Sequence, residues 1–331
     1  MPSPIVTVVV PTLAADDALS DCLRSLENQT IERFEVIVVD NSGAQRVKAP
    51  GVRVIANNGN VGFGAAINQG IRASETPYVA TLNDDAVAGP QWLEKLVEAA
   101  EARPGVGMCA SQVWLSGTGL LDSAGMLVAA DGSSKQRGNG VPDTFAGATD
   151  ALCPSGSAAL YRRKMLDEVG LFDEDFFLYC EDTDLGLRAR WAGWECAYVP
   201  GAVVQHRYSH SAGRATPLKA YFVERNRLSM VVKNFPWPML LLVKPASLVR
   251  YFWHLAFLME GRGKAAEYRE SGHSLVFLLF LTLRAWVSVT VRLPGLWRER
   301  RRIRRTRRIT SREFRTILAA HSISLRRVAE L

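Results

Sequence analysis

The segment IVTVVVPTLAADDALSDCLRSLENQTIERFEVIVVD (residues 5–40) contains two runs rich in Val and Ile on either side of an amphipathic stretch. The runs, residues 5–10 and 34–40, consist mainly of consecutive Val and Ile and do not alternate with polar residues, as is typical of strands that are buried on both faces. The stretch between them, residues 15–28, has the periodicity of a helix. Two buried strands joined through a helix predict a parallel pair, and therefore an α/β fold.

The same alternation continues along the chain. Such a succession predicts a mostly parallel, Rossmann-like sheet with helices on both faces, which binds ligands beyond the carboxyl ends of its strands. Residues 116–150 are rich in Gly, Ser and Asp and predict a hairpin and a mobile loop, after which regular structure resumes in 156–163. The further strands are expected at 52–56, 78–83 and 106–114, and the further helices at 62–74 and 91–102.

Composition limits the class of protein. With 331 residues, 48% of them hydrophobic, the chain is long enough for one large domain and an appendage. The five cysteines form no CxxC pair, which argues against a disulfide framework and a thiolate zinc site and favours a reducing cytoplasm. The N-terminal apolar run lacks a basic leader and stops at Pro11, so we expect a core strand and not a signal peptide.

Charge is distributed unevenly. Residues 1–204 hold 15 Lys and Arg against 26 Asp and Glu, whereas residues 205–331 hold 25 against 7. The basic excess is greatest in RERRRIRRTRR (298–308), which follows the apolar stretches 237–259 and 275–297.

Basic residues interrupt these apolar stretches and leave uninterrupted runs of about nine residues, whereas a bilayer span needs roughly 20. We therefore expect helices that lie on an anionic membrane surface and not through it. An ordinary helical subdomain with a solvated basic tail is the alternative. The interrupting residues are Lys244, Arg250, Arg284 and Arg292.

Polar residues follow the predicted strands. The strand 34–40 ends in Asp40, which can bind a nucleobase or ribose or can serve only the local turn. In NNGNVGFGAAINQG (57–70), Gly62 and Gly64 suit close approach by a nucleotide, but Ile67 stands where a dinucleotide fingerprint needs a third glycine.

Asn83-Asp84-Asp85 follows the strand 78–83. Adjacent carboxylates can hold a hard divalent cation, although two acids are also common in turns. Because Asp40 and Asp85 should emerge at the same sheet edge, we expect them to share one site.

The segment FFLYCEDTDLGLRARWAGW (176–194) crowds Glu181, Asp182 and Asp184 into four positions. Acids in the first turn of a helix stabilise it by about 0.3–1 kcal/mol each, which is one explanation, and a general base is the other. In HRYSHS (206–211), His206 is either a metal ligand or a buried histidine; His210 follows four residues later without the Glu of a zinc protease helix.

Taken in order, VVVPTL, VIVVDNSG, NVGFGAAINQG, LNDD, GSAALYRR, VGLFDEDFFLYCEDTDLGLRARWAGW and VVQHRYSHS resemble the family 2 glycosyltransferases with the GT-A fold, in particular their bacterial rhamnosyltransferase-like branch. The resemblance covers about residues 4–235. It implies a glycosyltransferase domain over 1–235, with a donor-binding half in about 1–115 and an acceptor half in about 150–235. A C-terminal amphipathic helical region then occupies 236–331.

The resemblance also implies roles for residues. Asp182 matches the general base and Glu181 its neighbour. Asp85 matches the acid that holds Mg²⁺ or Mn²⁺, and His206 matches a histidine that in some relatives helps to hold the metal or the diphosphate. Asn83 stands where a strict DxD motif has Asp. The donor-binding positions are Pro11, Thr12, Asp40, Asn41, Asn60, Gly62, Asn68 and Asp84.

We therefore expect an inverting, metal-dependent transferase of the cytoplasm, peripheral on the inner face of the cell membrane. Its donor would be a nucleotide sugar, with dTDP-rhamnose favoured, and its acceptor a polyprenyl-diphosphate-linked or polysaccharide glycan. A galactofuranosyl or other hexosyl transferase remains an alternative. A non-enzymatic nucleic-acid-binding protein would explain the Arg tract but not the acidic half, so we expect no nucleic acid partner; a homo-oligomer is left open.

Overall fold

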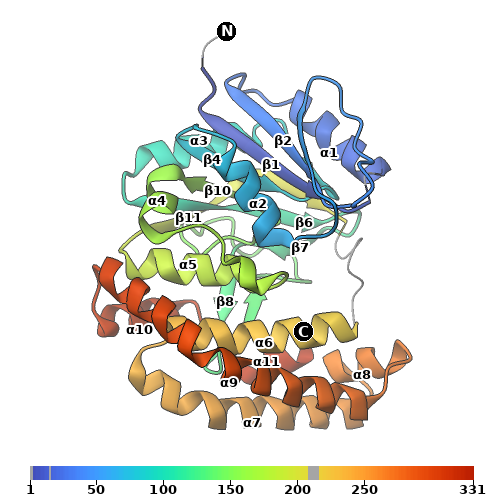
Figure 1. Ribbon diagram of the computed structural model, residues 1–331, viewed down its shortest axis with the longest axis vertical. Helices are drawn as coiled ribbons and strands as arrows, with labels where there is room; N and C mark the ends of the chain where they lie inside the picture. Colours follow the sequence, from blue (N-terminus) through green and yellow to red (C-terminus); the bar gives the residue numbers. More distant parts are fainter. Residues whose placement is uncertain (1–2, 15, 208–215) are drawn as a thin grey trace. The chain divides into compact units, whose positions relative to one another are not determined.

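The fold comes from a computed structural model that describes residues 3–14, 16–207 and 216–331 (Figure 1). These residues form two compact units. The first is built from Met1–Met126, Gln136–Phe177 and Glu181–Ser211, and the second from Leu127–Lys135, Leu178–Cys180 and Ala212–Leu331. The helix α6 (Pro217–Asn234), which the sequence placed in the catalytic domain, clusters with the second unit.

The first unit is organised around a nine-stranded sheet in the order β3-β2-β1-β4-β10-β6-β11-β5, and β7 pairs with β6. Strands β1, β2, β3 and β4 are parallel, as the alternation of strand and helix predicted. The strand bounds are β1 Val6–Thr12, β2 Phe34–Asp40, β3 Arg53–Ala56, β4 Tyr78–Leu82, β5 Ala86–Ala88, β6 Val106–Leu115, β7 Leu120–Ser123, β10 Ala158–Arg162 and β11 Glu195–His206.

Strand register brings the first two strand ends together. Val6 pairs with Phe34 and Thr12 pairs with Asp40, so β1 and β2 end level. Beyond β4 the sheet is mixed, because β10 runs antiparallel to both β4 and β6. The sequence predicted a strand here but not this direction, since sheet pairing is a long-range contact that local periodicity does not record.

Helices cover both faces of this sheet (Figure 1). Helices α1 (Asp17–Glu27) and α3 (Trp92–Ala102) pack on the face that carries Val6, Val8 and Val10. Helix α2 (Phe63–Arg72) crosses the other face, where Gly70 allows the close approach: a Cβ at this position would lie 2.5 Å from Val9 Cγ1. The side chains of successive strand residues point to opposite faces, which explains why continuous apolar runs are needed.

Three further helical elements follow in the first unit. They are α4 (Arg163–Val169), the 3-10 helix η1 (Glu174–Phe176) and α5 (Glu181–Trp191). Helix α5 begins with the acidic cluster, as its sequence predicted.

The second unit is helical apart from a small hairpin of β8 (Met126–Val128) and β9 (Ser134–Gln136). Helices α6 and α9 lie side by side and bury Leu228, Val289 and Leu296 between them. Helix α7 packs against α8 and α11. The bounds are α7 Trp237–Met259, α8 Gly263–Glu270, α9 Leu275–Thr306, α10 Ser311–Ala320 and α11 Leu325–Glu330.

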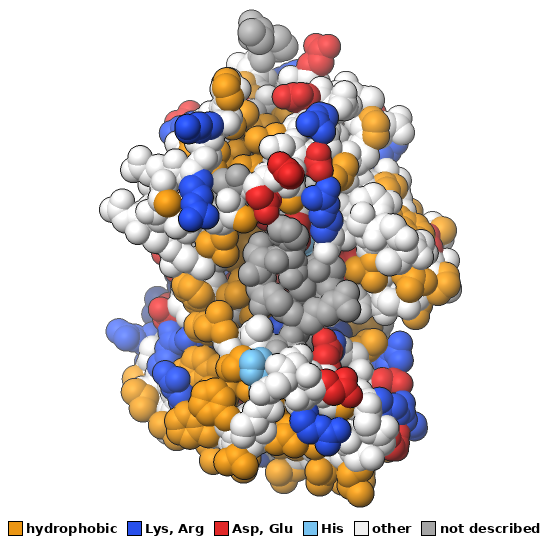
Figure 2. Space-filling model, turned by 90° about the vertical axis from the view of Figure 1, so that its right-hand side faces the viewer, with side chains coloured by type: hydrophobic (Ala, Val, Ile, Leu, Met, Phe, Trp, Pro, Cys, Tyr) orange, Lys and Arg blue, Asp and Glu red, His pale blue; other side chains and the backbone are white. Residues whose placement is uncertain are grey.

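Helices α7 and α9 carry apolar side chains on their outer faces. Leu241, Phe252, Phe280 and Val287 are each more than half exposed, and their helical spacing places them on continuous stripes. Figure 2 shows hydrophobic side chains gathered in the lower part of the view, with Lys and Arg at the margins.

Among the described residues, one helix, α9, is long and apolar enough to cross a membrane by length and composition, and only 17% of its apolar window is buried. Arg284 and Arg292, which interrupt the apolar run in the sequence, both lie within this one helix. The Arg284 guanidinium lies over the Tyr221 ring, 4.8 Å from its centroid, so the charge is accommodated beside the helix.

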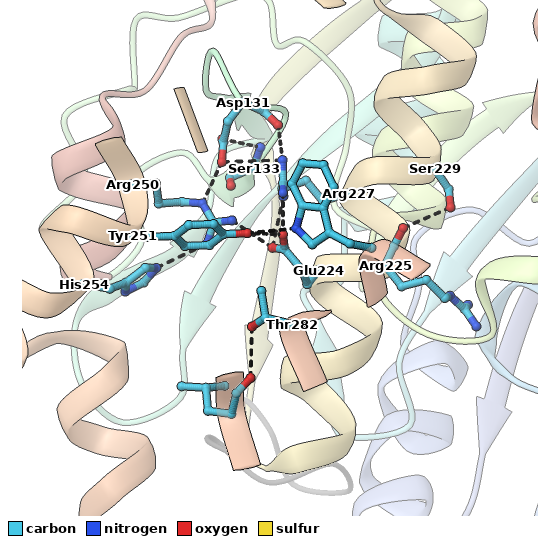
Figure 3. Close-up of polar contacts among 12 residues, drawn as sticks. Asp131, Ser133, Glu224, Arg225, Arg227, Ser229, Arg250, Tyr251, His254 and Thr282 are labelled. Atoms are coloured by element: carbon cyan, nitrogen blue, oxygen red, sulfur yellow. Dashed lines mark hydrogen bonds and ion pairs between the residues drawn. The ribbon is translucent and has the colours of Figure 1, made fainter. Parts of the chain in front are cut away.

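A buried network of charges joins three elements of the second unit (Figure 3). Asp131, in the β8–β9 hairpin, accepts a hydrogen bond from Arg250 Nε of α7 at 2.6 Å. Glu224 of α6 accepts from Arg250 at 2.8 Å and also pairs with Arg227. Tyr251 donates to Glu224 at 2.5 Å and Trp286 donates to Tyr251 at 3.2 Å, so the polar atoms of both side chains point to this network.

Candidate active site

Asp40 ends β2 with a buried carboxylate. One oxygen accepts a hydrogen bond from Ser42 N at 2.9 Å and the other from Val47 N at 3.0 Å. Burial disfavours the charged form, but these hydrogen bonds more than offset it and lower the pKa of Asp40. Asp40 therefore serves its local turn and stays ionised, and each oxygen keeps capacity to accept a further hydrogen bond from a ligand.

The loop before α2 is held by side-chain amides. Asn41 accepts a hydrogen bond from Asn57 at 2.7 Å, and Asn60 accepts from Gly62 N at 2.9 Å. Gly62 has φ +89°, and a Cβ there would lie 2.4 Å from Phe177 O. The glycine is thus required by its backbone conformation and by the approach of Phe177, whose carbonyl also accepts from the backbone N–H of Phe63 at 2.8 Å.

Two other predicted donor-binding positions lie at the end of β1. Pro11 pairs in register with Val39 and Thr12 with Asp40. Asn68, in contrast, is buried within α2 and its amide is hydrogen bonded inside the protein, to Phe172 N and O and to Glu174. In this structure Asn68 orders the segment that leads to α5.

Asp84 and Asp85 occupy the turn between β4 and β5, and both are buried. Asp85 Oδ1 lies 3.0 Å from His206 Nε2, at the end of β11. His206 Nδ1 lies 2.8 Å from Asp122 Oδ2 of β7. The sequence prediction missed Asp122, because it is a single Asp in a Gly- and Ser-rich stretch and only strand pairing brings it to the histidine.

His206 sits between two carboxylates. Burial alone would lower the pKa of His206, but the hydrogen bonds with Asp122 and Asp85 raise it to about 10. In many metal sites a carboxylate bonds to one ring nitrogen of a histidine whose other nitrogen binds the metal. Asp122 is placed to be that carboxylate, and Asp85 lies on the other side of His206. The predicted position His210 lies outside the described residues.

The fit to a divalent cation rests on Asp85 and His206. Within 3–14, 16–207 and 216–331, no group of three or more His, Cys, Asp or Glu side chains is arranged to hold a metal ion. Mg²⁺ is commonly held by one or two protein oxygens with the remaining ligands from phosphate and water. Two protein ligands therefore fit an ion that a nucleoside diphosphate helps to bind.

Asp182 lies in the first turn of α5 and is partly exposed. Its Oδ2 accepts a hydrogen bond from Gly156 N at 3.0 Å, and its Oδ1 accepts from Thr183 N at 2.6 Å. Burial raises the pKa of Asp182 although these hydrogen bonds oppose the shift. A partly exposed carboxylate with a raised pKa is suited to accept a proton.

Glu181 precedes it and is 6% exposed. Burial, followed by the charges of Asp182 and Asp184, raises the pKa of Glu181 to about 8. Its Oε2 has no hydrogen-bond partner in the part of the chain that the structure describes. Glu181 is thus held in its neutral form at neutral pH.

The third acid of the cluster, Asp184, has a structural role. Its Oδ2 accepts a hydrogen bond from Arg188 Nε at 2.9 Å, and both side chains are buried. Arg188 also donates to the carbonyls of Val169, Gly170 and Leu171. The pair fixes α5 against the end of α4, which is the structural alternative that the sequence left open for Asp184.

Two neighbouring residues connect the acidic turn of β4 to the start of α5. Ser157 O accepts a hydrogen bond from Asn83 N at 2.9 Å, and Gly156 N donates to Asp182. The strand β10 begins directly afterwards, so its antiparallel insertion beside β4 brings Gly156, the partner of Asp182, close to Asn83, which precedes Asp84 and Asp85.

The sequence is similar to that of known glycosyltransferases. The family model Glycosyl transferase family 2 matches residues 7–170. N-acetylglucosaminyl-diphospho-decaprenol L-rhamnosyltransferase of Mycobacterium tuberculosis is 31% identical over 243 residues, which cover 63% of this chain and 78% of that protein.

Solved structures agree in fold. The mannosyltransferase PcManGT from Pyrobaculum calidifontis, in complex with GDP-Man and Mn²⁺, has a TM-score of 0.50 at 15% identity, covering 91% of this chain and 85% of its own. GalNAc-T7 with UDP, GalNAc and Mn²⁺ has a TM-score of 0.56 at 14% identity, covering 70% and 48%. At such identities the likeness concerns the fold, which is GT-A, as the sequence resemblance implied. With the sequence relationship, it confirms that the chain belongs to the family 2 glycosyltransferases and is rhamnosyltransferase-like.

Proposed function

We propose that this glycosyltransferase moves a sugar, with inversion at the anomeric carbon, from a nucleotide sugar to a lipid-linked glycan acceptor. The observation that supports the proposal is a partly exposed Asp182 carboxylate held by Gly156, whose neighbour Ser157 bonds to Asn83 at the strand end that leads to Asp85 and its partner His206. The mycobacterial relative is named for rhamnose transfer to a diphospho-decaprenol-linked sugar. This name favours dTDP-rhamnose as donor and a polyprenyl-diphosphate-linked acceptor.

The proposed reaction is one displacement. An acceptor hydroxyl oxygen forms a bond to the anomeric carbon while the bond from that carbon to the diphosphate oxygen breaks, and its electron pair leaves with the diphosphate. Asp182 takes the hydroxyl proton. Asp40, Asp84 and their strand-end neighbours would bind the nucleoside, and Gly156 holds Asp182 in place.

Asp85 and His206 would hold a Mg²⁺ or Mn²⁺ ion, which when bound supplies positive charge beside a leaving diphosphate. Asp122 would then fix the tautomer and orientation of His206. Titration with EDTA, and then with Mg²⁺ or Mn²⁺, tests this part of the proposal through donor binding and turnover. Full turnover in excess EDTA would contradict it.

We also place the enzyme in the cytoplasm, on the inner face of the cell membrane. The support is the exposed apolar stripe of α7 and α9, beside an Arg tract in which seven of the arginines are exposed. Apolar anchors and basic residues together are the usual means of binding an anionic surface. A lipid-linked acceptor presents its hydroxyl close to such a surface.

A donor screen is the decisive experiment. Nucleoside diphosphate release would be measured with dTDP-rhamnose, UDP-galactofuranose, UDP-glucose and GDP-mannose, each with a lipid-linked N-acetylglucosaminyl diphosphate acceptor. We expect dTDP-rhamnose to give the fastest release, and Asp182→Asn to slow that release by about 10²–10⁴. Faster release from UDP-galactofuranose would select the galactofuranosyl alternative, and no release from any donor would refute the proposal.

A further inference from the structure

The buried network of the second unit leaves no carboxylate free for other cations. Asp131 and Glu224 are both engaged by Arg227 and Arg250, two negative and two positive groups (Figure 3). Burial by itself would raise the pKa values of the two acids, but the arginines lower both, so the acids stay ionised and paired. Any further cation on this side of the hairpin is in excess.

Lys135 of β9 is such a cation. It is only partly exposed, and its ammonium makes no hydrogen bond or ion pair with any residue that the structure describes. The charges that act on it most are positive, Lys264 of α8 and Lys219 of α6, followed by Arg250 of α7. The acidic Glu267 of α8 is already held by Lys264 at 2.8 Å. Burial, and then these cations, lower the pKa of Lys135 to about 7.

His254 of α7 adds a second unused donor, and Arg250 links it to Asp131 of the hairpin that carries Lys135. Its Nε2 lies 3.3 Å from a guanidinium nitrogen of Arg250, which can only donate, so Nε2 accepts and the ring proton is on Nδ1. Nδ1 is buried and has no hydrogen-bond partner among the described residues. Burial, Arg250 and Lys135 lower the pKa of His254 to about 3, which keeps the ring neutral. A buried N–H without a partner is unfavourable, and a ligand oxygen would supply the missing acceptor.

We infer that Lys135 and His254 form a site for a phosphate group, flanked by Lys219 and Lys264, and that this group belongs to the diphosphate of a lipid. Phosphate oxygens accept charge-assisted hydrogen bonds and would satisfy both donors at once. The assignment to a lipid follows from α7 itself: Arg250 and His254 lie on its inner side, while Phe252 and others on its outer side are exposed and apolar. The identification of this lipid as the acceptor substrate rests on the proposed function.

Binding to vesicles tests the inference without turnover. Full-length protein would be titrated with phosphatidylcholine vesicles that carry undecaprenyl diphosphate, and with vesicles in which phosphatidylglycerol gives the same surface charge. We expect Lys135→Met to weaken binding to the undecaprenyl diphosphate vesicles about tenfold, as for one lost charge-assisted hydrogen bond. Lys244→Met is the matched control: it removes an equal charge from an exposed position of α7 and should cost less than about twofold.

Equal losses in K135M and K244M, or no loss in K135M, would overturn the inference. Binding of inorganic diphosphate as tight as that of the vesicles would overturn the assignment to a lipid. Lys264→Met, on the partly exposed helix α8, keeps the test valid if K135M does not fold, and should weaken binding in the same direction. Titration with dTDP-rhamnose separates the two proposals: its failure to bind would refute the donor assignment, while the vesicle comparison would still decide the phosphate site.

Discussion

Glu181 and Asp182, at the start of α5, differ in protonation state because their surroundings differ. Glu181 is buried, has an oxygen without a partner in the described structure, and has its pKa raised to about 8. Asp182 is partly exposed and accepts hydrogen bonds from Gly156 and Thr183, which favour its charged form. At neutral pH the proton therefore resides on Glu181, and Asp182 is the member of the pair that can take a proton from an acceptor.

The first prediction concerns Asp182→Asn. Turnover should fall by about 10²–10⁴, because the amide cannot accept the proton. The structure adds a second effect: an amide has one acceptor oxygen, so either Gly156 N or Thr183 N loses its partner, at a cost of about 1–3 kcal/mol in unfolding free energy. Turnover and urea denaturation measured on one preparation check both effects. Near wild-type turnover in D182N together with inactive Glu181→Gln would transfer the role of base to Glu181.

The second prediction concerns pH and stability. The folded-state pKa of Glu181 is raised from its ordinary 4.5 to about 8, so its contribution to stability is fully present below 4.5 and is lost as pH rises through that window. We expect the unfolding free energy of the wild type to decline between these pH values, and that of Glu181→Gln to decline less. Denaturation series at several pH values provide the measurement, and parallel curves for the two proteins would contradict the assignment.

The third prediction concerns Asp122, which touches His206 and not the proposed donor. Asp122→Asn should raise the Mn²⁺ concentration needed for half-maximal activity by about 10–100-fold, because the histidine loses the carboxylate that orients it. A control is Glu75→Gln, which removes an exposed carboxylate from the same unit and should leave the Mn²⁺ requirement unchanged. A purely structural role for Asp122 would lower stability without altering that requirement.

At the scale of elements, the C-terminal helices are held together by buried charge as well as by apolar packing. Arg300 belongs to the Arg tract, yet it is buried and donates to the carbonyls of Val232 and Lys233 at the end of α6. It therefore satisfies carbonyls that a helix end leaves without partners. The tract that composition marks as a uniform basic surface contains at least one residue that serves folding.

The fourth prediction tests the buried network. Asp131→Asn removes one of the two carboxylates that pair with Arg250, the one at 2.6 Å, and leaves excess buried positive charge, which should lower the unfolding free energy by about 3–5 kcal/mol. Glu260→Gln is the comparison, because its pair with Arg262 is exposed and should contribute less than about 1 kcal/mol. Urea denaturation at neutral pH measures both. An equal, small effect of the two substitutions would show that the network does not stabilise the second unit.

How far the sequence could predict these elements depended on the range of the interaction. Helix α7 occupies 237–259, as the apolar stretch predicted, and β2 occupies 34–40, because both follow from local periodicity. Tyr251 donates to Glu224 and Trp286 donates to Tyr251, and composition cannot place these acceptors because both are distant in sequence from their donors. Asp122 was missed for the same reason, whereas Asp85 and His206 stand at strand ends that the sequence marks.

At the scale of the whole molecule, the exposed apolar face of α7 and α9 should bind a membrane, which is the fifth prediction. Full-length protein should float with anionic liposomes. Phe252→Glu or Val287→Glu should weaken this binding about tenfold at low and high salt, because each places a charge where an exposed apolar side chain would enter the membrane. Leu218→Glu, at an exposed apolar position of α6, should have little effect. Replacing exposed arginines such as Arg301 and Arg304 with Gln should weaken binding only at low salt.

Protein that remains in the soluble fraction with anionic liposomes at low salt would rule the membrane assignment out. Equal effects of F252E and L218E would instead show that the loss is not specific to the outer face of α7.

The contact between Gly62 and Phe177 makes the enzyme sensitive to a mutation that removes no reactive group. A Cβ at position 62 would collide with the Phe177 carbonyl. Any other residue there must therefore displace either α2 or the segment that leads from Phe177 to α5. For a geneticist, the codon of Gly62 is thus a source of conditional alleles: the protein would be made and would keep every catalytic side chain, yet glycan assembly would fail as temperature rises.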